Sequence, residues 1–198
     1  MAATLDQTCL RFVVITWCFL VGGTSTHLFA ETPIQALQET VDRFQHILHD
    51  SSLLEDGRKE QVLGTILARF DVLEMSKRML GPYWEQHREQ QDAFVEEFTA
   101  FMKRLFLKQF DQIKALKVSC RGEEIQGSTA KVVTNLSTSG EEFTINFRMH
   151  QYDSGWKIYD VMLDKGSFGL IKNYRAQVQS LLQFSSFEQM LYLIREKK

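Results

Sequence analysis

The sequence predicts an α+β fold, in which an antiparallel meander sheet of about four strands is covered by N-terminal and C-terminal helices. Apolar residues recur at helical spacing from Thr32 to about Phe110 and again from Ser167, whereas between these segments they alternate with a period of two. No repeat, low-complexity tract or Pro/Gly-rich linker interrupts this order. We therefore expect a single domain over residues 31–198, arranged as helices, a sheet, then helices.

Residues 1–30 have the organisation of a secretory signal peptide. Arg11 precedes an apolar run from Phe12 to Val21, and small residues follow it. The run is about ten residues long, whereas a membrane-spanning helix needs roughly twenty. We expect cleavage near Ala30 and export of the remaining chain, with an uncleaved interfacial anchor as the alternative.

The composition limits the kinds of partner and the means of stabilisation. Cys120 is the one cysteine outside the leader, so the exported fold must be stable without an intramolecular disulfide. The net charge is −2, which argues against nucleic acid as a partner because phosphate binding needs a concentrated basic surface. Fifteen phenylalanines are a heavy aromatic load for 198 residues, and they must be buried in a core, a pocket or an interface.

Local signals delimit the first three helices. Thr32 is placed to cap a helix whose first position is Pro33. A polar break at residues 51–58 separates this helix from the second. Asp71 can cap a short third helix, which Gly81 and the proline after it would end.

The fourth helix, from about Glu89 to Phe110, has an apolar stripe wider than one packing surface uses. One face can therefore lie in the core while its flank contacts a ligand or a partner. The centre of the stripe consists of Phe94, Phe98, Phe101 and Leu105. Its flank, about 80–120° further round the helix axis, consists of Val95, Met102 and Phe106.

The period of two begins after Ala115 and predicts the strands of the meander. Their ranges are Leu116–Cys120, Thr129–Leu136, Phe143–Met149 and Trp156–Leu163. Alternation gives the sheet one apolar face, which needs helices over it. Helical spacing returns over Leu170–Leu182, and Ser185-x-x-Glu188 is interpreted as the capping box of a last helix.

The sequence contains no constellation that predicts catalysis, a metal site or a cofactor. Cys120 lacks a recognisable nucleophile signature, and His46 and His49 lack the further ligands that a metal would need. Asp160 lies in an otherwise apolar strand, where a carboxylate must find donors. We expect a structural ion pair or hydrogen bond, with Arg175 as a candidate partner, and the alternative is a head-group or substrate role.

Four segments, in this order, resemble the MlaC family, also called the toluene-tolerance family, of periplasmic phospholipid-binding proteins. They are Phe70-Asp71 with Met75, Arg78, Leu80-Gly81 and Trp84; the helix from Phe94 to Phe106; Trp156 to Val161; and Asn173-Tyr174-Arg175 with Gln177. The resemblance covers nearly all of the chain after the leader. It implies a soluble, monomeric periplasmic carrier that maintains outer-membrane lipid asymmetry. Such a carrier shuttles phospholipid between an outer-membrane lipoprotein complex and an inner-membrane ABC transporter.

Elementary energetics agree with such a carrier. Two acyl chains contain roughly thirty methylenes, and exposing them to water would cost on the order of 25 kcal/mol at ~0.8 kcal/mol each, so a carrier needs an enclosed cavity. We expect the fourth helix, the last two strands and the helix from Leu170 to enclose it, with Arg175 near the mouth as a possible head-group ligand. The expected lining residues are Phe98, Phe101, Met102, Leu105, Phe106, Phe143, Ile145, Phe147, Trp156, Ile158, Tyr159, Leu170 and Tyr174.

Four alternatives remain open from the residues. A related carrier could be dedicated to another lipid, such as a hopanoid. A scaffold could use the same apolar face to dock helices of a partner protein, or the aromatic residues could simply fill a core. An enzyme would need a charged constellation inside the cavity.

Overall fold

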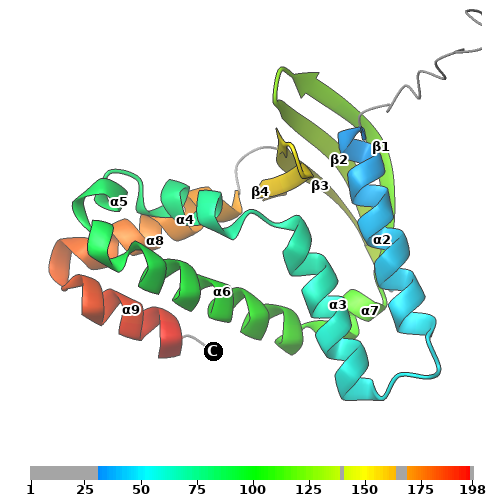
Figure 1. Cartoon of the computed structure of the whole chain (residues 1–198), viewed down its shortest axis with the longest axis horizontal. Helices are drawn as coiled ribbons and strands as arrows, with labels where there is room; N and C mark the ends of the chain where they lie inside the picture. Colours follow the sequence, from blue (N-terminus) through cyan, green and yellow to red (C-terminus); the bar gives the residue numbers. More distant parts are fainter. Residues whose placement is uncertain (1–30, 139–140, 164–168, 197–198) are drawn as a thin grey trace, which may run out of the picture. The chain divides into compact units, whose positions relative to one another are not determined.

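The computed structural model describes residues 31–138, 141–163 and 169–196 (Figure 1). The predicted signal peptide lies outside these residues. Residues Glu31–Lys198 form one compact unit. Within the described part of the chain, no helix combines the length and apolar character needed to cross a membrane.

Helices precede the sheet, as the periodicity predicts. They are α2 (Pro33–His49), α3 (Glu55–Arg69), α4 (Val72–Leu80), α5 (Tyr83–Gln86), a 3₁₀ turn (Arg88–Gln90), α6 (Gln91–Lys108) and α7 (Phe110–Lys114). The Thr32 hydroxyl accepts a hydrogen bond from the Gln35 amide, and the Gln35 side chain accepts one from the Thr32 amide. Asp71 Oδ1 accepts from the Glu74 amide at 2.9 Å, and α4 ends at Gly81 with φ +56°. The predicted caps are therefore confirmed.

Four antiparallel strands follow in the spatial order β1-β2-β3-β4, which confirms the meander. They are β1 (Lys117–Gln126), β2 (Thr129–Thr138), β3 (Glu141–Tyr152) and β4 (Gly155–Leu163). The register between β3 and β4 shifts after Arg148, because Arg148 pairs with Asp160 and Met149 with Ile158. Tyr159 is thus an extra, unpaired residue that forms a β-bulge in β4. The bulge changes the direction of the Tyr159 side chain.

The last helices are α8 (Leu170–Phe184) and α9 (Phe187–Glu196). The predicted position of the second capping box is wrong by one residue. The Ser186 hydroxyl accepts from the Gln189 amide at 3.2 Å, and the Gln189 side chain accepts from the Ser186 amide at 3.0 Å. Ser185 instead donates its hydroxyl to the Leu181 carbonyl at 2.6 Å, so it belongs to the end of α8.

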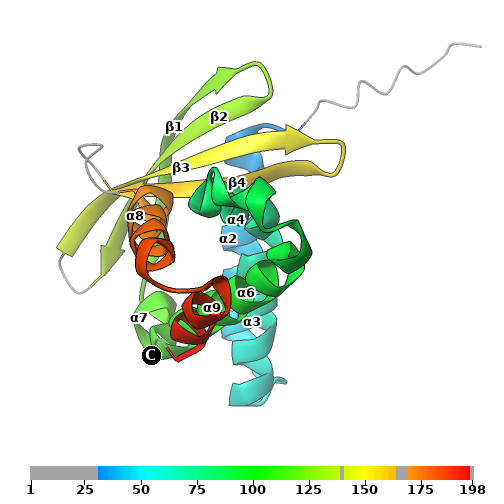
Figure 2. The same ribbon diagram turned by 90° about the vertical axis from the view of Figure 1, so that its left-hand side faces the viewer.

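The helices gather on one side of the sheet (Figure 2). Helix α2 contacts β1, β2 and β4, whereas α4 and α8 contact β4. Buried side chains form three clusters: one among α4, α6, α8 and α9, one between the sheet and α2, and one among α2, α3 and α7. The candidate site lies where the second and third clusters meet.

Candidate functional site

An apolar cavity of about 180 Å³ lies between the sheet and the helices α2, α3, α6 and α7. Every strand contributes to its wall. All the lining side chains are apolar except those of Thr40 and Arg69. The full set is Leu37, Thr40, Val41, Phe44, Ile66, Arg69, Phe70, Phe106, Ile113, Leu116, Val118, Leu136, Phe147 and Ile158.

The local structure explains how these residues converge. Leu37, Val41 and Phe44 are four and three residues apart on α2, so they share one face of that helix. Phe70 is held against the sheet edge, because the next residue's amide donates to the Ile158 carbonyl at 2.8 Å. Its ring lies 6.1 Å from the ring of Phe106, centroid to centroid. Phe70 therefore contacts both β4 and α6 beside the cavity.

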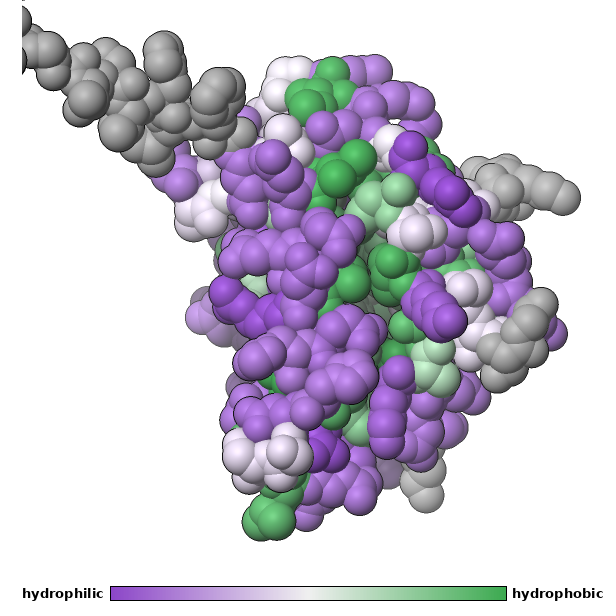
Figure 3. Space-filling view, turned by 90° about the vertical axis from the view of Figure 1, so that its right-hand side faces the viewer, coloured by the Kyte–Doolittle hydropathy of each residue, from purple (hydrophilic) through white to green (hydrophobic). Residues whose placement is uncertain are grey.

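A band of hydrophobic surface crosses the face that carries α2 and β1, between flanks of hydrophilic surface (Figure 3). Leu37 and Val41 of α2 and Val118 of β1 belong to the cavity wall on this side. The band therefore indicates where an apolar ligand can reach the cavity from solvent.

A second pocket, of about 210 Å³, lies within the helical cluster. The rings of Phe94, Phe98 and Phe101 follow one another at centroid distances of 6.4 and 6.3 Å, and Tyr174 meets Phe101 edge-on at 5.4 Å. Burial raises the pKa of Tyr174. The lining residues are Met79, Phe94, Phe98, Phe101, Tyr174, Gln177, Val178, Leu181, Leu193 and Ile194.

The residues predicted to line one cavity are thus divided between two pockets. Phe106, Phe147 and Ile158 line the cavity under the sheet, and Phe98, Phe101 and Tyr174 line the helical pocket. Of the others, Met102 is buried in the helical cluster, Leu170 packs against it, Leu105 and Ile145 are half-buried, and Phe143 is exposed near the start of β3.

Trp156 and Tyr159 have other surroundings. Trp156 packs in the cluster between the sheet and α2, and its indole nitrogen donates to the Glu31 carbonyl at 2.8 Å. The ring of Tyr159 lies under the Arg78 guanidinium, 4.2 Å from its carbon, and 5.3 Å from the ring of His150. Tyr159 also lines a polar pocket with Lys131 and Arg148. The bulge in β4 accounts for this direction.

The lining residues missing from the predicted set lie on α2, α3, α7, β1 and β2, together with Phe70 and Leu116 between elements. The stripe on α2 is visible in the sequence as apolar residues at helical spacing, but this pattern is the same for a core and for a cavity wall. Phe70 precedes the cap of α4 and belongs to a segment that resembles the MlaC family, but nothing in its spacing assigns it to a cavity wall. The cavity arises only where these elements converge.

Asp160 accepts hydrogen bonds from backbone amides and not from Arg175. Its Oδ1 accepts from the Val161 amide at 2.9 Å and from the buried Ile171 amide at 3.1 Å. The carboxylate thereby satisfies a free donor in the first turn of α8 and interacts favourably with the helix dipole. The expectation of a structural hydrogen bond is confirmed, but its proposed partner is wrong.

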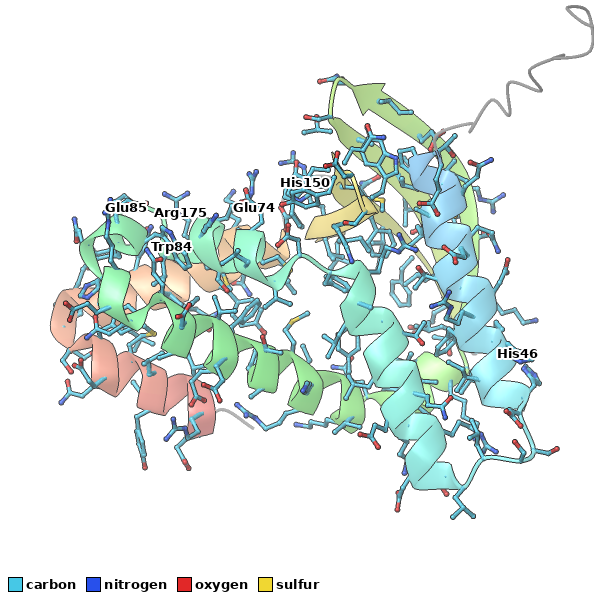
Figure 4. All side chains as sticks on the ribbon, in the orientation of Figure 1. His46, Glu74, Trp84, Glu85, His150 and Arg175 are labelled. Atoms are coloured by element: carbon cyan, nitrogen blue, oxygen red, sulfur yellow. The ribbon has the colours of Figure 1, made fainter. Side chains whose placement is uncertain are left out.

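Arg175 lies on an exposed part of α8 beside the end of α4, as its position next to Trp84 in Figure 4 shows. A Cβ at Gly81 would lie 2.9 Å from the Nη2 atom of Arg175. Arg175 is not among the residues that line the apolar cavity in the described structure. Its role as a head-group ligand stays a prediction.

One polar cluster joins α4 to the β3–β4 hairpin. Asp71 Oδ2 accepts from His150 Nε2 at 2.8 Å and from the Tyr152 hydroxyl at 2.6 Å. Burial raises the pKa of Asp71, but the bonds from Tyr152, the Glu74 amide and His150 outweigh it, so the pKa lies below its ordinary value. The hydrogen bond to Asp71 raises the pKa of Tyr152 to about 12. These side chains hold one another in place, so the cluster has a structural role: it connects the start of α4 to β3.

The other groups considered for chemistry have unreactive surroundings. Burial raises the pKa of the Cys120 thiol, which disfavours the nucleophilic thiolate. His46 is exposed on α2 (Figure 4), and His49 Nδ1 lies 2.7 Å from the Gln45 carbonyl. Among the described residues, no group of three or more His, Cys, Asp or Glu side chains could hold a metal ion.

An α+β shell with an apolar cavity beneath its sheet defines a class of proteins that bind apolar or amphiphilic small molecules. Residues 38–196 match the family model described as MlaC protein, so the chain belongs to the MlaC family. The resemblance predicted from the sequence is therefore confirmed. Membership indicates a binding or transport protein rather than an enzyme.

Among solved structures, the chain is similar to the phospholipid-binding protein from Ralstonia solanacearum in complex with a phospholipid. The two share 17% identity with a TM-score of 0.68, over 81% of this chain and 93% of that chain. This similarity confirms the α+β fold. A de novo β-sheet design protein matches 37% of this chain and 87% of its own at 24% identity, but its TM-score of 0.26 supports no argument. No curated protein matches the chain significantly.

Proposed function

We propose that this protein binds a phospholipid, with the acyl chains in the cavity under the sheet, and carries it through the periplasm. The observation that supports the proposal is a cavity whose wall is apolar on all sides except at Thr40 and Arg69. Membership of the MlaC family and the phospholipid in the Ralstonia relative point to the same ligand class. An outer-membrane lipoprotein complex and an inner-membrane ABC transporter are the proposed donor and acceptor.

The size of the cavity implies that it widens when the ligand enters. Pockets that bury a whole small ligand have volumes of roughly 300–1,000 Å³, whereas this cavity measures about 180 Å³. Large rings such as Phe70, Phe106 and Phe147 project into it, and rotation of these side chains would enlarge it. Since the contacts are apolar and non-directional, we expect acyl chains to be recognised by burial rather than by shape.

Lipid retention by the purified protein tests the binding step. The protein is incubated with phospholipid vesicles, separated from them and examined by native mass spectrometry. We expect a bound phospholipid in the wild type and none in Phe147→Arg, because the cavity offers no carboxylate to pair with the new charge.

Phe184→Arg is the matched control, since Phe184 is 87% exposed at the end of α8, and it should retain lipid. Circular dichroism establishes that both variants are folded. A folded wild type that takes up no lipid would contradict the proposal. Preferential uptake of a hopanoid over phospholipid would identify the other carrier class.

Export and transfer need separate experiments. N-terminal sequencing of the protein from a periplasmic fraction should begin near Glu31 and show that the leader is removed. Transfer is measured as movement of labelled phospholipid from donor to acceptor vesicles that carry the two membrane complexes. A protein that binds lipid but never accelerates this movement would be a lipid-binding protein without the carrier role.

A further inference from the structure

A polar pocket of about 200 Å³ adjoins the apolar cavity between α2, α3 and the β3–β4 turn. Thr40 and Arg69 line both spaces. The two side chains are hydrogen-bonded to each other, with Arg69 Nε donating to Thr40 Oγ1 at 2.7 Å. Together they form a shared wall, with an apolar compartment on one side and a polar one on the other. The lining residues of the polar pocket are Glu39, Thr40, Arg43, Thr65, Ala68, Arg69, Ser154 and Lys157.

This polar pocket is basic although the chain as a whole has a net charge of −2. Arg43, Arg69 and Lys157 line it, and Glu39 is the one acidic residue among its lining residues in the described structure. The other polar pocket with two cations, which contains Lys131 and Tyr159, shares no lining residue with the apolar cavity in the described structure. A cationic site next to the apolar cavity therefore occurs at the α2–α3 side.

The cations of the pocket keep donors for a ligand. Arg69 also donates from Nη1 to the Trp156 carbonyl at 3.0 Å and from Nη2 to Glu39 at 3.3 Å, which leaves two of the five N–H groups of a guanidinium. Lys157 Nζ donates to the Ala68 carbonyl at 2.6 Å and has two further hydrogens. Glu39 also pairs with Arg43 at 3.1 Å.

We infer that the pocket formed by Arg43, Arg69 and Lys157 binds the phosphate of the phospholipid whose acyl chains occupy the adjoining cavity. The inference rests on the proposed function. Guanidinium groups bind phosphate with paired, charge-assisted hydrogen bonds. Glu39, which bridges Arg43 and Arg69 in the structure, occupies the position of an anion, and the phosphate takes its place. Since Thr40 and Arg69 line both compartments, the phosphate would lie directly next to the cavity that holds the acyl chains.

The donors of this pocket are suited to the phosphodiester rather than to the alcohol attached to it. All three are cations, and Glu39 is the lone carboxylate of the lining set that could contact an ammonium group. The pocket therefore selects for phosphate and distinguishes poorly among head groups. Phosphatidylglycerol and phosphatidylethanolamine should bind similarly, and both should bind better than diacylglycerol, which has the same chains and no phosphate.

Competition between lipids tests the inference. The full-length mature protein is incubated with vesicles that contain equal amounts of phosphatidylglycerol and diacylglycerol, and the retained lipids are quantified after extraction. We expect the wild type to favour phosphatidylglycerol. In the double variant Arg43→Gln, Lys157→Gln, this preference should fall by about five- to tenfold, as expected for the loss of two partly exposed charge pairs. Retention of diacylglycerol should stay unchanged.

Two comparisons make the experiment specific. The control Arg88→Gln, Lys131→Gln removes one arginine and one lysine that lie on the surface away from the pocket, each paired with a glutamate, and it should keep the preference. Glu39→Gln should strengthen the preference for phosphatidylglycerol, because it removes the anion that competes with the phosphate. An opposite effect of Glu39→Gln cannot come from a general loss of structure.

The outcomes separate the inference from the proposed function. If the wild type retains both lipids equally, or if the double variant keeps the full preference, the phosphate site is wrong while lipid binding stands. If the wild type retains neither lipid, the proposed function fails and the phosphate site with it.

Discussion

Asp160→Ala should destabilise the protein by about 2–3 kcal/mol, because the substitution removes the acceptor for the amides of Val161 and Ile171. Asp160 is 8% exposed, so water replaces the carboxylate poorly at the buried Ile171 amide. In a domain of this size, the loss corresponds to a fall in melting temperature of about 4–12 °C. Asp160→Asn keeps one acceptor oxygen and loses mainly the charge at the start of α8, which costs about 0.3–1 kcal/mol.

Urea unfolding followed by circular dichroism measures these differences. Asp153→Ala is the control, since Asp153 is exposed in the turn before β4, and it should shift the free energy of unfolding by less than about 0.5 kcal/mol. A value for Asp160→Ala within that range would refute the capping role. If Asp160→Asn kept full stability but lost phospholipid, Asp160 would act on the ligand, which is the alternative considered from the sequence.

Three further predictions concern other parts of the structure. The pKa of Asp71 is lower in the folded protein than its ordinary value of 3.8, so the stability it contributes is present above that value and is lost as the pH falls through the folded pKa. The difference in unfolding free energy between wild type and Asp71→Asn should therefore shrink below about pH 4. A constant difference would contradict a stabilising hydrogen bond from Tyr152 to the charged Asp71 carboxylate. Gly81→Ala should cost about 1–3 kcal/mol in thermal unfolding, because the backbone has φ +56° and the new Cβ would meet the Arg175 guanidinium. Iodoacetamide should modify Cys120 more slowly in the native protein than in urea at pH 8, since burial raises the pKa of the thiol; equal rates would show that the thiol is accessible.

Features that depend on neighbouring residues could be predicted from the sequence. Thr32, Asp71 and Gly81 act within one helical turn, where cap preferences reflect local hydrogen bonds and backbone angles. The strands were equally predictable, because alternation marks a sheet with one buried face. The second capping box was displaced since Ser185 and Ser186 both fit the pattern, and only the end of α8 decides between them.

The candidate site could be predicted only in part, because it depends on contacts between distant segments. Phe106 and Phe101 belong to one apolar stripe, yet α6 presents Phe106 to the cavity under the sheet and Phe101 to the helical pocket. Tyr159 follows the alternation of its strand until the bulge opposite Arg148 changes its direction. The spacing of apolar residues indicates that Phe101 and Phe106 point in different directions, but not that each faces a separate pocket, and it does not encode the bulge.

Phe70 packs against both the helical cluster and the cluster under the sheet. The helical cluster has its own buried core around Met79, Phe94 and Met190, so it can keep its packing while α2 and α3 move away from the sheet. Parts of a protein that unfold separately differ in how strongly their backbone amides are protected from hydrogen exchange. Hydrogen exchange should therefore show two cooperative units, with Phe70 at their boundary.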